Sequence, residues 1–486
     1  MKEYKYNWCG GLRTLEDPHF AIFGTPGGGK SLTTSMLEDS VLGPGPRPRV
    51  HATIYDAKLE LYPYLCQIFD SDAIHLLHCF DKRAVRWAIK RDVHNAPRAL
   101  QVASAFIPKT GEEKNPYFRA QARAFVTEAM NSLRLRELDW TLNDLLQACS
   151  DPETLHALWK AHPNTEFMAV REGAVESTKD IHSTIDSVFA QLVYAASASA
   201  RSSNRWFSAR RWLKEPPSIV LLPYDSTYDE ALGPVNRAIF QYLVDEILHQ
   251  PKGREVETWT FFDEARLAGR MPGLVDLMRT GRSKRNHTVL GIQDVAGLID
   301  VHGESVAKEL LGLCGNKLFL RLTEPSTAKY ASECFGSAAV EETTVSDGVT
   351  KGGKSKSRTT TENRAPKDAK VILESEFLRL RSPSKELRQG YTGFVLPPLP
   401  RSGSDEPDRA QPRYGLNHKY RVRVDGAYLD EHLRPEPSPK FLEECPAYAQ
   451  VDDQDMERLV WTEEQRRYFL EPRDDGPFES MGVQQL

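Results

Sequence analysis

The feature that most constrains this chain is a glycine-rich segment near its start. Residues 20–23 are apolar, the pattern Gly-x-x-x-x-Gly-Lys-Ser spans residues 24–31, and a run suited to a helix follows. A strand, a glycine-rich turn and a helix start form a phosphate-binding loop, where backbone N–H groups and the helix N-terminus converge on an anion. The residues that we expect to contact a nucleotide are Gly24, Thr25, Pro26, Gly27, Gly28, Gly29, Lys30, Ser31 and Leu32.

Two of these residues have chemical roles in such a loop. Lys30 would reach the β- and γ-phosphates, and the Ser31 hydroxyl would bind Mg²⁺. The loop therefore predicts ATP and Mg²⁺ as ligands. The alternative is a chance glycine-rich turn, which the preceding strand makes less common.

A second motif lies far along the chain, where an apolar strand over residues 258–262 ends in Asp263 and Glu264. In a phosphoryl-transfer site the first acid holds Mg²⁺ and the second polarises the attacking water. An acidic strand end is a weak signal alone, but together with a phosphate loop it predicts ATP hydrolysis. Gln293 ends the next predicted strand, where its amide could sense the γ-phosphate or orient water. A hydrogen-bonded core glutamine is the alternative.

The order of predicted elements indicates a parallel α/β sheet interrupted by helices. We expect strands over residues 50–56, 73–78, 218–223, 257–262, 288–293, 317–322 and 393–397. Helical periodicity dominates residues 96–106, 117–135, 141–148, 152–161, 178–200 and 231–249.

These patterns predict four regions. Residues 1–90 and 176–400 would form the two parts of the nucleotide-binding domain, and residues 91–175 an inserted all-α domain. Residues 345–370 are basic and of low complexity, which predicts a mobile loop. Residues 401–486 would form an acidic, proline-linked C-terminal extension.

Composition limits the function classes. The net charge of −5 means that any contact with nucleic acid must come from local clusters, for which residues 201–211, 279–285 and 345–370 are candidates. A solvated surface is the alternative for each cluster. The seven cysteines include no CxxC pair, which is typical of a reducing cytoplasm. We see neither a signal peptide nor a membrane span, so we expect a cytoplasmic chain.

A family resemblance rests on three stretches. They read Phe-Asp-Glu-Ala-Arg-Leu at 262–267, Leu-Val-Asp-Leu-Met-Arg-Thr-Gly-Arg-Ser-Lys at 274–284, and Val-Leu-Gly-Ile-Gln-Asp-Val-Ala-Gly-Leu at 289–298. Together with the phosphate loop they resemble the type IV secretion coupling proteins, hexameric ATPases of the FtsK/HerA group. The resemblance covers about residues 18–400 with the motif order preserved.

This resemblance implies a RecA-like P-loop domain in a homohexameric ring that pumps single- or double-stranded DNA, alone or with bound protein, toward a transfer channel. Arg282 matches the arginine that completes a neighbouring subunit's site. Relaxase, accessory and secretion-channel proteins are the implied partners. Members usually begin with a transmembrane anchor, which we do not see here, so we expect attachment to the inner membrane through a partner.

Two other functions remain open from the sequence. One is an FtsK/HerA-type ring translocase for DNA packaging, repair or defence, unconnected to secretion. The other is a nucleotide-gated assembly scaffold, against which Glu264 and Arg282 argue.

Overall fold

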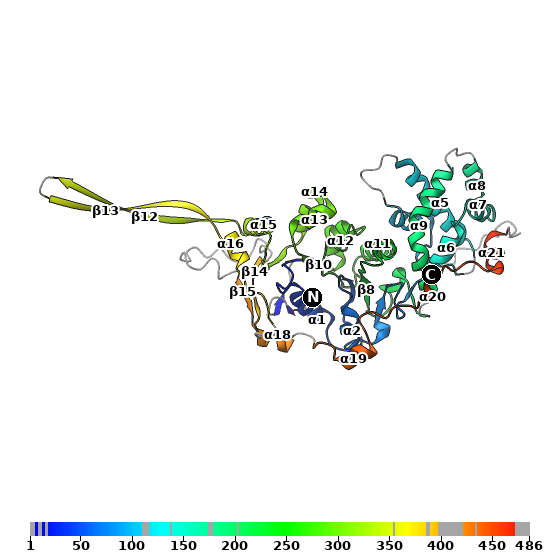
Figure 1. The fold of residues 1–486 in the computed structure, drawn as a ribbon, viewed down its shortest axis with the longest axis horizontal. Helices are drawn as coiled ribbons and strands as arrows, with labels where there is room; N and C mark the ends of the chain where they lie inside the picture. Colours follow the sequence, from blue (N-terminus) through cyan, green and yellow to red (C-terminus); the bar gives the residue numbers. More distant parts are fainter. Residues whose placement is uncertain are drawn as a thin grey trace. The chain divides into compact units, whose positions relative to one another are not determined.

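The computed structural model describes residues 5–7, 12–14, 18–108, 116–136, 139–173, 178–201, 204–352, 355–384, 389–396, 421–432 and 435–471. Its largest sheet has nine strands, is mostly parallel and has the strand order β15-β14-β11-β3-β10-β9-β4-β8-β5. These strands are β3 (His19–Phe23), β4 (His51–Asp56), β5 (Ile74–Leu76), β8 (Ile219–Pro223), β9 (Thr258–Phe262), β10 (Asn286–Ile292), β11 (Asn316–Phe319), β14 (Tyr391–Leu396) and β15 (Arg421–Val424). Figure 1 labels β8, β10, β14 and β15 of this sheet.

The registers place the strand that carries the glycine-rich loop inside the sheet. β3 pairs in parallel with β10 on one side, Phe23 opposite Ile292, and with β11 on the other, Phe23 opposite Phe319. Every residue of β3, β4, β8 and β9 is buried. Strands buried throughout are typical of a parallel sheet that is covered on both faces. β14 and β15 extend one edge in antiparallel pairing.

By its contacts the chain divides into two compact units. The first unit comprises residues 1–43, 261–269 and 287–435, and the second comprises residues 44–260, 270–286 and 436–486. This division differs from the boundaries that the sequence predicts.

The helices of the first unit are α1 (Lys30–Leu42), α13 (Val295–His302), α14 (Glu304–Leu313), α15 (Pro325–Phe335), α16 (Glu374–Leu378) and α18 (Gly426–His432). Its strands outside the central sheet are β1 (Lys5–Asn7), β2 (Leu12–Thr14), β12 (Ser337–Gly352) and β13 (Ser355–Lys370).

The second unit is largely helical. Its helices are α2 (Leu61–Cys66), η1 (Ser71–Ala73), α3 (Ile89–Asp92), α4 (Ala96–Phe106), α5 (Pro116–Arg134), α6 (Leu142–Ala148), α7 (Pro152–Lys160), α8 (Glu166–Gly173), α9 (Thr178–Arg201), α10 (Ala209–Trp212), α11 (Asp229–Leu248), α12 (Leu274–Thr280), η2 (Gly281–Lys284), α19 (Pro439–Glu444), α20 (Asp453–Met456) and α21 (Glu463–Leu470). Two short strands, β6 (Arg86–Trp87) and β7 (Trp206–Phe207), pair in parallel where the chain enters and leaves the region of α4 to α9.

Local sequence explains where several of these helices begin. The side chains of Asn95, Thr141 and Asp151 each accept a hydrogen bond from a backbone N–H in the first turn of α4, α6 and α7. Such N-caps satisfy donors that have no partner within the helix. The helices expected at residues 96–106, 117–135, 141–148, 152–161 and 178–200 are present within a residue or two. The sequence pattern missed α8.

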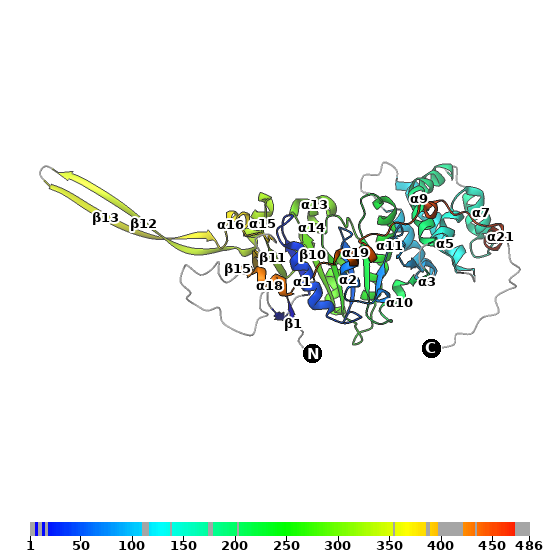
Figure 2. The ribbon, with the colours of Figure 1, turned by 60° about the horizontal axis from the view of Figure 1, so that its bottom comes forward.

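The basic segment over residues 345–370 is not a loop. β12 and β13 pair as an antiparallel hairpin from Ser337 opposite Lys370 to Gly352 opposite Ser355 (Figure 2). The scarcity of apolar residues predicts a loop, but threonines at 350 and 359–361 favour extended backbone, because β-branched residues have high strand propensity.

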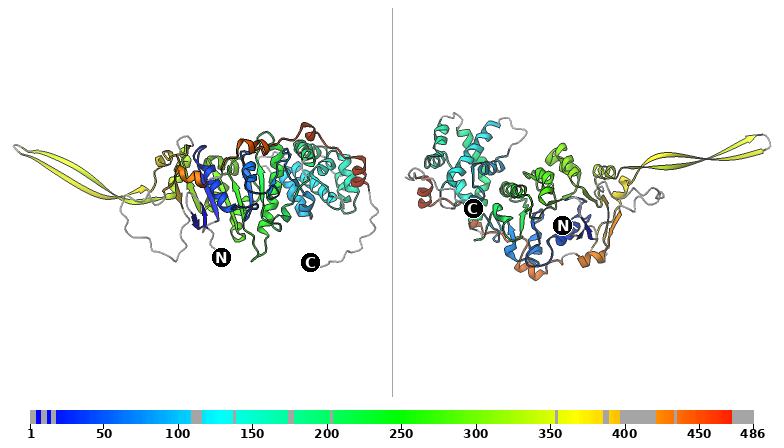
Figure 3. Two further views of the ribbon diagram at one scale, coloured as in Figure 1. Left: turned by 90° about the horizontal axis from the view of Figure 1, so that it is seen from below. Right: turned by 180° about the vertical axis from the view of Figure 1, so that it is seen from behind.

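The described residues after 420 do not form a separate body. β15 belongs to the central sheet, α20 lies against α9, and α21 lies against α7 (Figure 3, where the last helices are red). Arg201 donates hydrogen bonds to the carbonyls of Gln454, Asp455 and Glu457, and Arg136 donates to those of Phe469 and Glu471. Among the residues described, no helix is both long and apolar enough to cross a membrane.

Candidate nucleotide-binding site

The glycine-rich loop is held by both strands that flank β3. Gly24 donates its N–H to the carbonyl of Ile292 at the end of β10, over 3.0 Å. Thr25 donates its N–H over 3.0 Å and its hydroxyl over 3.2 Å to the carbonyl of Arg321, just beyond β11. Gly27 and Gly29 have φ values of 71° and 101°, a left-handed conformation that favours glycine. The backbone therefore curls at the carboxyl edge of the sheet, directly before α1.

A buried tyrosine, Tyr391, packs against the glycine-rich loop. A Cβ atom at Gly29 would lie 3.2 Å from the ring of Tyr391, a tight contact at which the ring would have to shift slightly. The hydroxyls of Tyr391 and Thr33 share a hydrogen bond of 2.7 Å, and Tyr391 is fully buried. Tyr391 is not predictable from the sequence, because a tyrosine at the start of a strand far along the chain carries no local signal.

The two acids that follow β9 lie against the loop. The Lys30 ammonium forms an ion pair with the Glu264 carboxylate, and the side chains are only 10% and 17% exposed. The Ser31 hydroxyl lies 3.3 Å from Oδ2 of Asp263. Residues from opposite halves of the chain meet because the carboxyl ends of parallel strands share one edge of the sheet. The structure thus brings together the lysine, the hydroxyl and both acids that the sequence singled out.

The donor set suits magnesium. Mg²⁺ takes oxygen ligands and is usually held by one or two carboxylates together with substrate phosphates. The Ser31 hydroxyl and the Asp263 carboxylate are such ligands. The described residues contain no cluster of three or more histidines, cysteines and acids, as a metal cage built by protein alone would need.

The remaining predicted residues lie in three places. Gln293 directly follows β10, is exposed, and lines a narrow hollow with Glu264 and Asp294. Pro26 is exposed at the tip of the loop, and Leu32 is half-buried in α1. Arg282 belongs to the second unit, where it lies exposed on η2 rather than in the core of its own chain.

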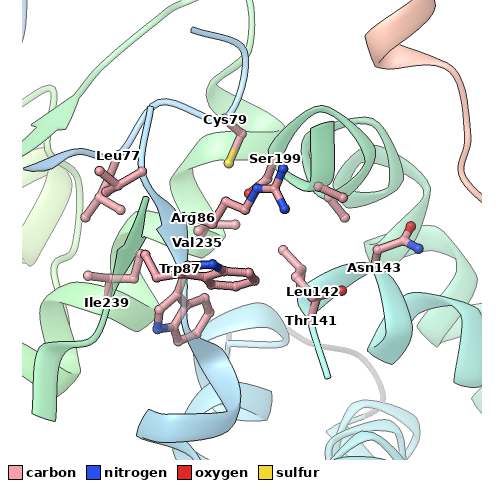
Figure 4. A pocket seen from close by; sticks show the side chains of 14 residues that line it. Leu77, Cys79, Arg86, Trp87, Thr141, Leu142, Asn143, Ser199, Val235 and Ile239 are labelled. Carbon is pink, nitrogen blue, oxygen red and sulfur yellow. The ribbon is translucent and has the colours of Figure 1, made fainter. Parts of the chain in front are cut away.

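A different hollow in the second unit does not suit a nucleotide. It lies between β6, α6, α9 and α11, and Leu77, Trp87, Leu142 and Ile239 point into it (Figure 4). Its volume of about 30 Å³ corresponds to roughly one water molecule. We therefore regard it as a packing defect of the core.

A mostly parallel sheet with a glycine-rich loop after one strand and an acidic pair after another strand defines a RecA-like P-loop domain. Comparison with known proteins narrows this class. Residues 12–395 match the family described as the type IV secretion-system coupling protein DNA-binding domain, and the chain belongs to that family.

Relatives of known name agree with this assignment. The coupling protein TraD of Escherichia coli (strain K12) is 22% identical over 333 residues, which are 67% of this chain and 44% of TraD. The chain thus spans less than half the length of that relative.

Solved structures share the fold. The plasmid coupling protein TrwB in complex with ADP and Mg²⁺ is similar with a TM-score of 0.64 at 17% identity, over 93% of each chain. TrwB in complex with a non-hydrolysable ATP analogue gives the same values. Unbound TrwB lacking its N-terminal segment gives a TM-score of 0.61 at 18% identity, over 82% of this chain and 87% of that one.

Proposed function

We propose that this protein is an ATP-hydrolysing motor of a type IV secretion or conjugation system, which recruits DNA and moves it to the transfer channel. The observation that carries the proposal is the meeting of Lys30 with Glu264, and of Ser31 with Asp263, in a chain of the coupling-protein family. The crystallised relative TrwB, which shares the fold, binds ADP with Mg²⁺.

Each residue of the site has a distinct task in this proposal. Lys30 and the loop N–H groups would hold the β- and γ-phosphates. Ser31 and Asp263 would hold Mg²⁺, which when bound neutralises charge on the phosphate oxygens. Glu264 would accept a proton from the attacking water, and Gln293 would orient that water. The Lys30 ammonium cannot contact the phosphates while it is ion-paired with Glu264. Nucleotide binding would therefore break this pair and free the Glu264 carboxylate to act as the general base.

We further propose that the site is completed by a second copy of the chain. Arg282 is exposed, which suits a cation that stabilises charge on a phosphoryl group bound by a neighbour. A ring of six such copies around DNA is the arrangement that the family membership favours. Relaxase, accessory and channel proteins would be its partners, and one of them would attach the ring to the inner membrane.

The experiment that tests this function is ATP turnover by the purified chain, alone and with single- or double-stranded DNA. We expect hydrolysis that DNA stimulates, and loss of turnover in the Glu264→Gln variant with nucleotide binding retained. Absence of turnover under every condition would exclude a motor. Nucleotide-dependent assembly without turnover would favour a scaffold instead.

A further inference from the structure

A strongly basic hollow lies in the second unit, outside the nucleotide site. We name it the α3–α10 basin. Among the described residues its lining comprises Lys90, Arg91, Arg210, Arg211, Lys214, the polar His94 and Ser208, and one carboxylate, Asp139. Its volume is about 330 Å³, and it shares no residue with the glycine-rich loop or the acidic pair. Five permanent cations in one hollow contrast with the net charge of −5 of the whole chain.

A buried carboxylate fixes the two short helices that carry four of these cations. Asp92, at the end of α3, is fully buried. It accepts hydrogen bonds from Nε1 of Trp87 (2.7 Å), the Ser208 hydroxyl (2.6 Å), and the backbone N–H groups of Ala209 and Arg210 (3.1 Å each). Lys90 and Arg91 on α3 are thereby held beside Arg210 and Arg211 on α10. Burial raises the pKa of Asp92, and these four donors oppose that rise.

Few acids compensate the cations. Lys90 pairs with Asp139 at 3.6 Å, and Arg211 pairs with Glu215 at 3.2 Å. Among the described residues, neither Arg91, Arg210 nor Lys214 has a carboxylate within ion-pair distance. Glu246 is near enough that Lys214 and Arg210 oppose the rise in its pKa that burial causes. The basin therefore keeps an excess of positive charge at its surface.

We infer that the α3–α10 basin binds the phosphate backbone of nucleic acid. Arginine and lysine side chains that reach phosphates supply most of the sequence-independent affinity for nucleic acid. Phosphates recur along a strand, so cations on two helices and on Lys214 can each neutralise a different one, whereas one small anion would engage only some of them. The inference deepens the proposed function by locating a surface that would hold DNA. It does not depend on ATP hydrolysis.

The test measures binding of labelled single-stranded and duplex DNA to the full chain without nucleotide, over a range of salt concentrations. The variant replaces Arg91, Arg210 and Lys214 by Gln. The matched control replaces three exposed cations elsewhere, Lys252, Arg254 and Lys308, by Gln. We expect the basin variant to bind at least roughly tenfold more weakly than the control near 0.15 M salt. For a single strand, its slope of log affinity against log salt should be shallower by roughly 2 if each removed cation neutralises one phosphate.

A second variant tests whether misfolding explains weaker DNA binding by the basin variant. Asp139→Asn removes the carboxylate that lines the described part of the basin and breaks its pair with Lys90, so DNA should bind more tightly, a gain that damaged protein cannot produce. Equal affinity and salt slope in the basin variant and the control would overturn the inference. Unchanged DNA binding with loss of binding to vesicles of anionic phospholipid would overturn it too, and would assign the basin to a membrane surface. Because DNA binding is measured without ATP, its outcome is separate from that of the turnover assay.

Discussion

Replacing Glu264 by Gln should tighten nucleotide binding while it stops hydrolysis. The wild-type carboxylate holds the Lys30 ammonium in a pair that is largely shielded from water, with side chains 10% and 17% exposed. A hydrogen bond to a charged group contributes about 1.5–3 kcal/mol, against about 1 kcal/mol for a neutral one. In the amide variant the interaction that competes with nucleotide for Lys30 should therefore be weaker by about 0.5–2 kcal/mol, which corresponds to roughly 2- to 30-fold tighter nucleotide binding. Loss of the general base should slow turnover by about 10²- to 10⁴-fold.

The assay is calorimetric titration of the variant and the wild type with ATP and with ADP, both with Mg²⁺, beside steady-state turnover. Glu257→Gln is the matched control, since it removes the same charge at the other end of β9, where Glu257 pairs with Arg285. This control should leave nucleotide affinity unchanged. If Glu264→Gln binds ATP no more tightly than the wild type, Glu264 does not compete for Lys30 and the reasoning is refuted.

Three further changes test other parts of the structure. Lys30→Ala removes the phosphate ligand and leaves Glu264 without its cation, so nucleotide affinity should fall by about 2–3 kcal/mol, and an unchanged titration would contradict the assigned role. Thr33→Val removes the hydrogen bond between the buried Thr33 and Tyr391 hydroxyls and should lower the free energy of unfolding by about 0.5–1.5 kcal/mol. In urea unfolding, Thr33→Val combined with Tyr391→Phe should cost less than the sum of the single changes, and strict additivity would show that the bond contributes nothing. Burial lowers the pKa of His51 and of His75 from 6.5 to about 4. The unfolded chain then takes up protons first as the pH falls, so stability from these residues is complete above pH 6.5 and is lost toward pH 4, by about 2 kcal/mol each at pH 5. Urea unfolding at pH 7 and pH 5 should show a smaller loss when both histidines are replaced by Gln, and an equal loss would refute the assignment.

The meeting of the side chains in the candidate nucleotide site could be predicted from the sequence because each of its two motifs is local. The glycines, Lys30 and Ser31 are contiguous, and Asp263 and Glu264 follow a recognisable strand. The two motifs meet because the carboxyl ends of parallel strands lie at the same edge of the sheet, which is where ligands bind in such folds. The strands and most helices are predictable for a similar reason, since their periodic apolar residues are contiguous in the chain.

Other features depend on distant partners that leave no local pattern. Tyr391 packs against Gly29 and hydrogen-bonds to Thr33, although it lies 358 residues after Thr33 in the chain. In the sequence Asp92 cannot be distinguished from other acids in polar stretches, because its hydrogen bond with Ser208 forms only in the folded chain. Arg136 and Arg201 anchor the C-terminal segment through backbone carbonyls, which every residue type offers, so the acceptor sequence cannot reveal the contact.

The most direct test of the central claim, that a neighbouring copy completes the nucleotide site, is a mixing experiment with two inactive variants. Lys30→Ala lacks the phosphate ligand, and Arg282→Ala lacks the cation offered to a neighbour. Each variant alone should be inactive. In an equimolar mixture, about a quarter of the contacts in a randomly assembled ring should join an intact Lys30 to an intact Arg282, so ATP turnover should return to a measurable fraction of the wild-type rate. If the variants exchange subunits and the mixture stays as inactive as its components, Arg282 does not complete the site of a neighbouring subunit.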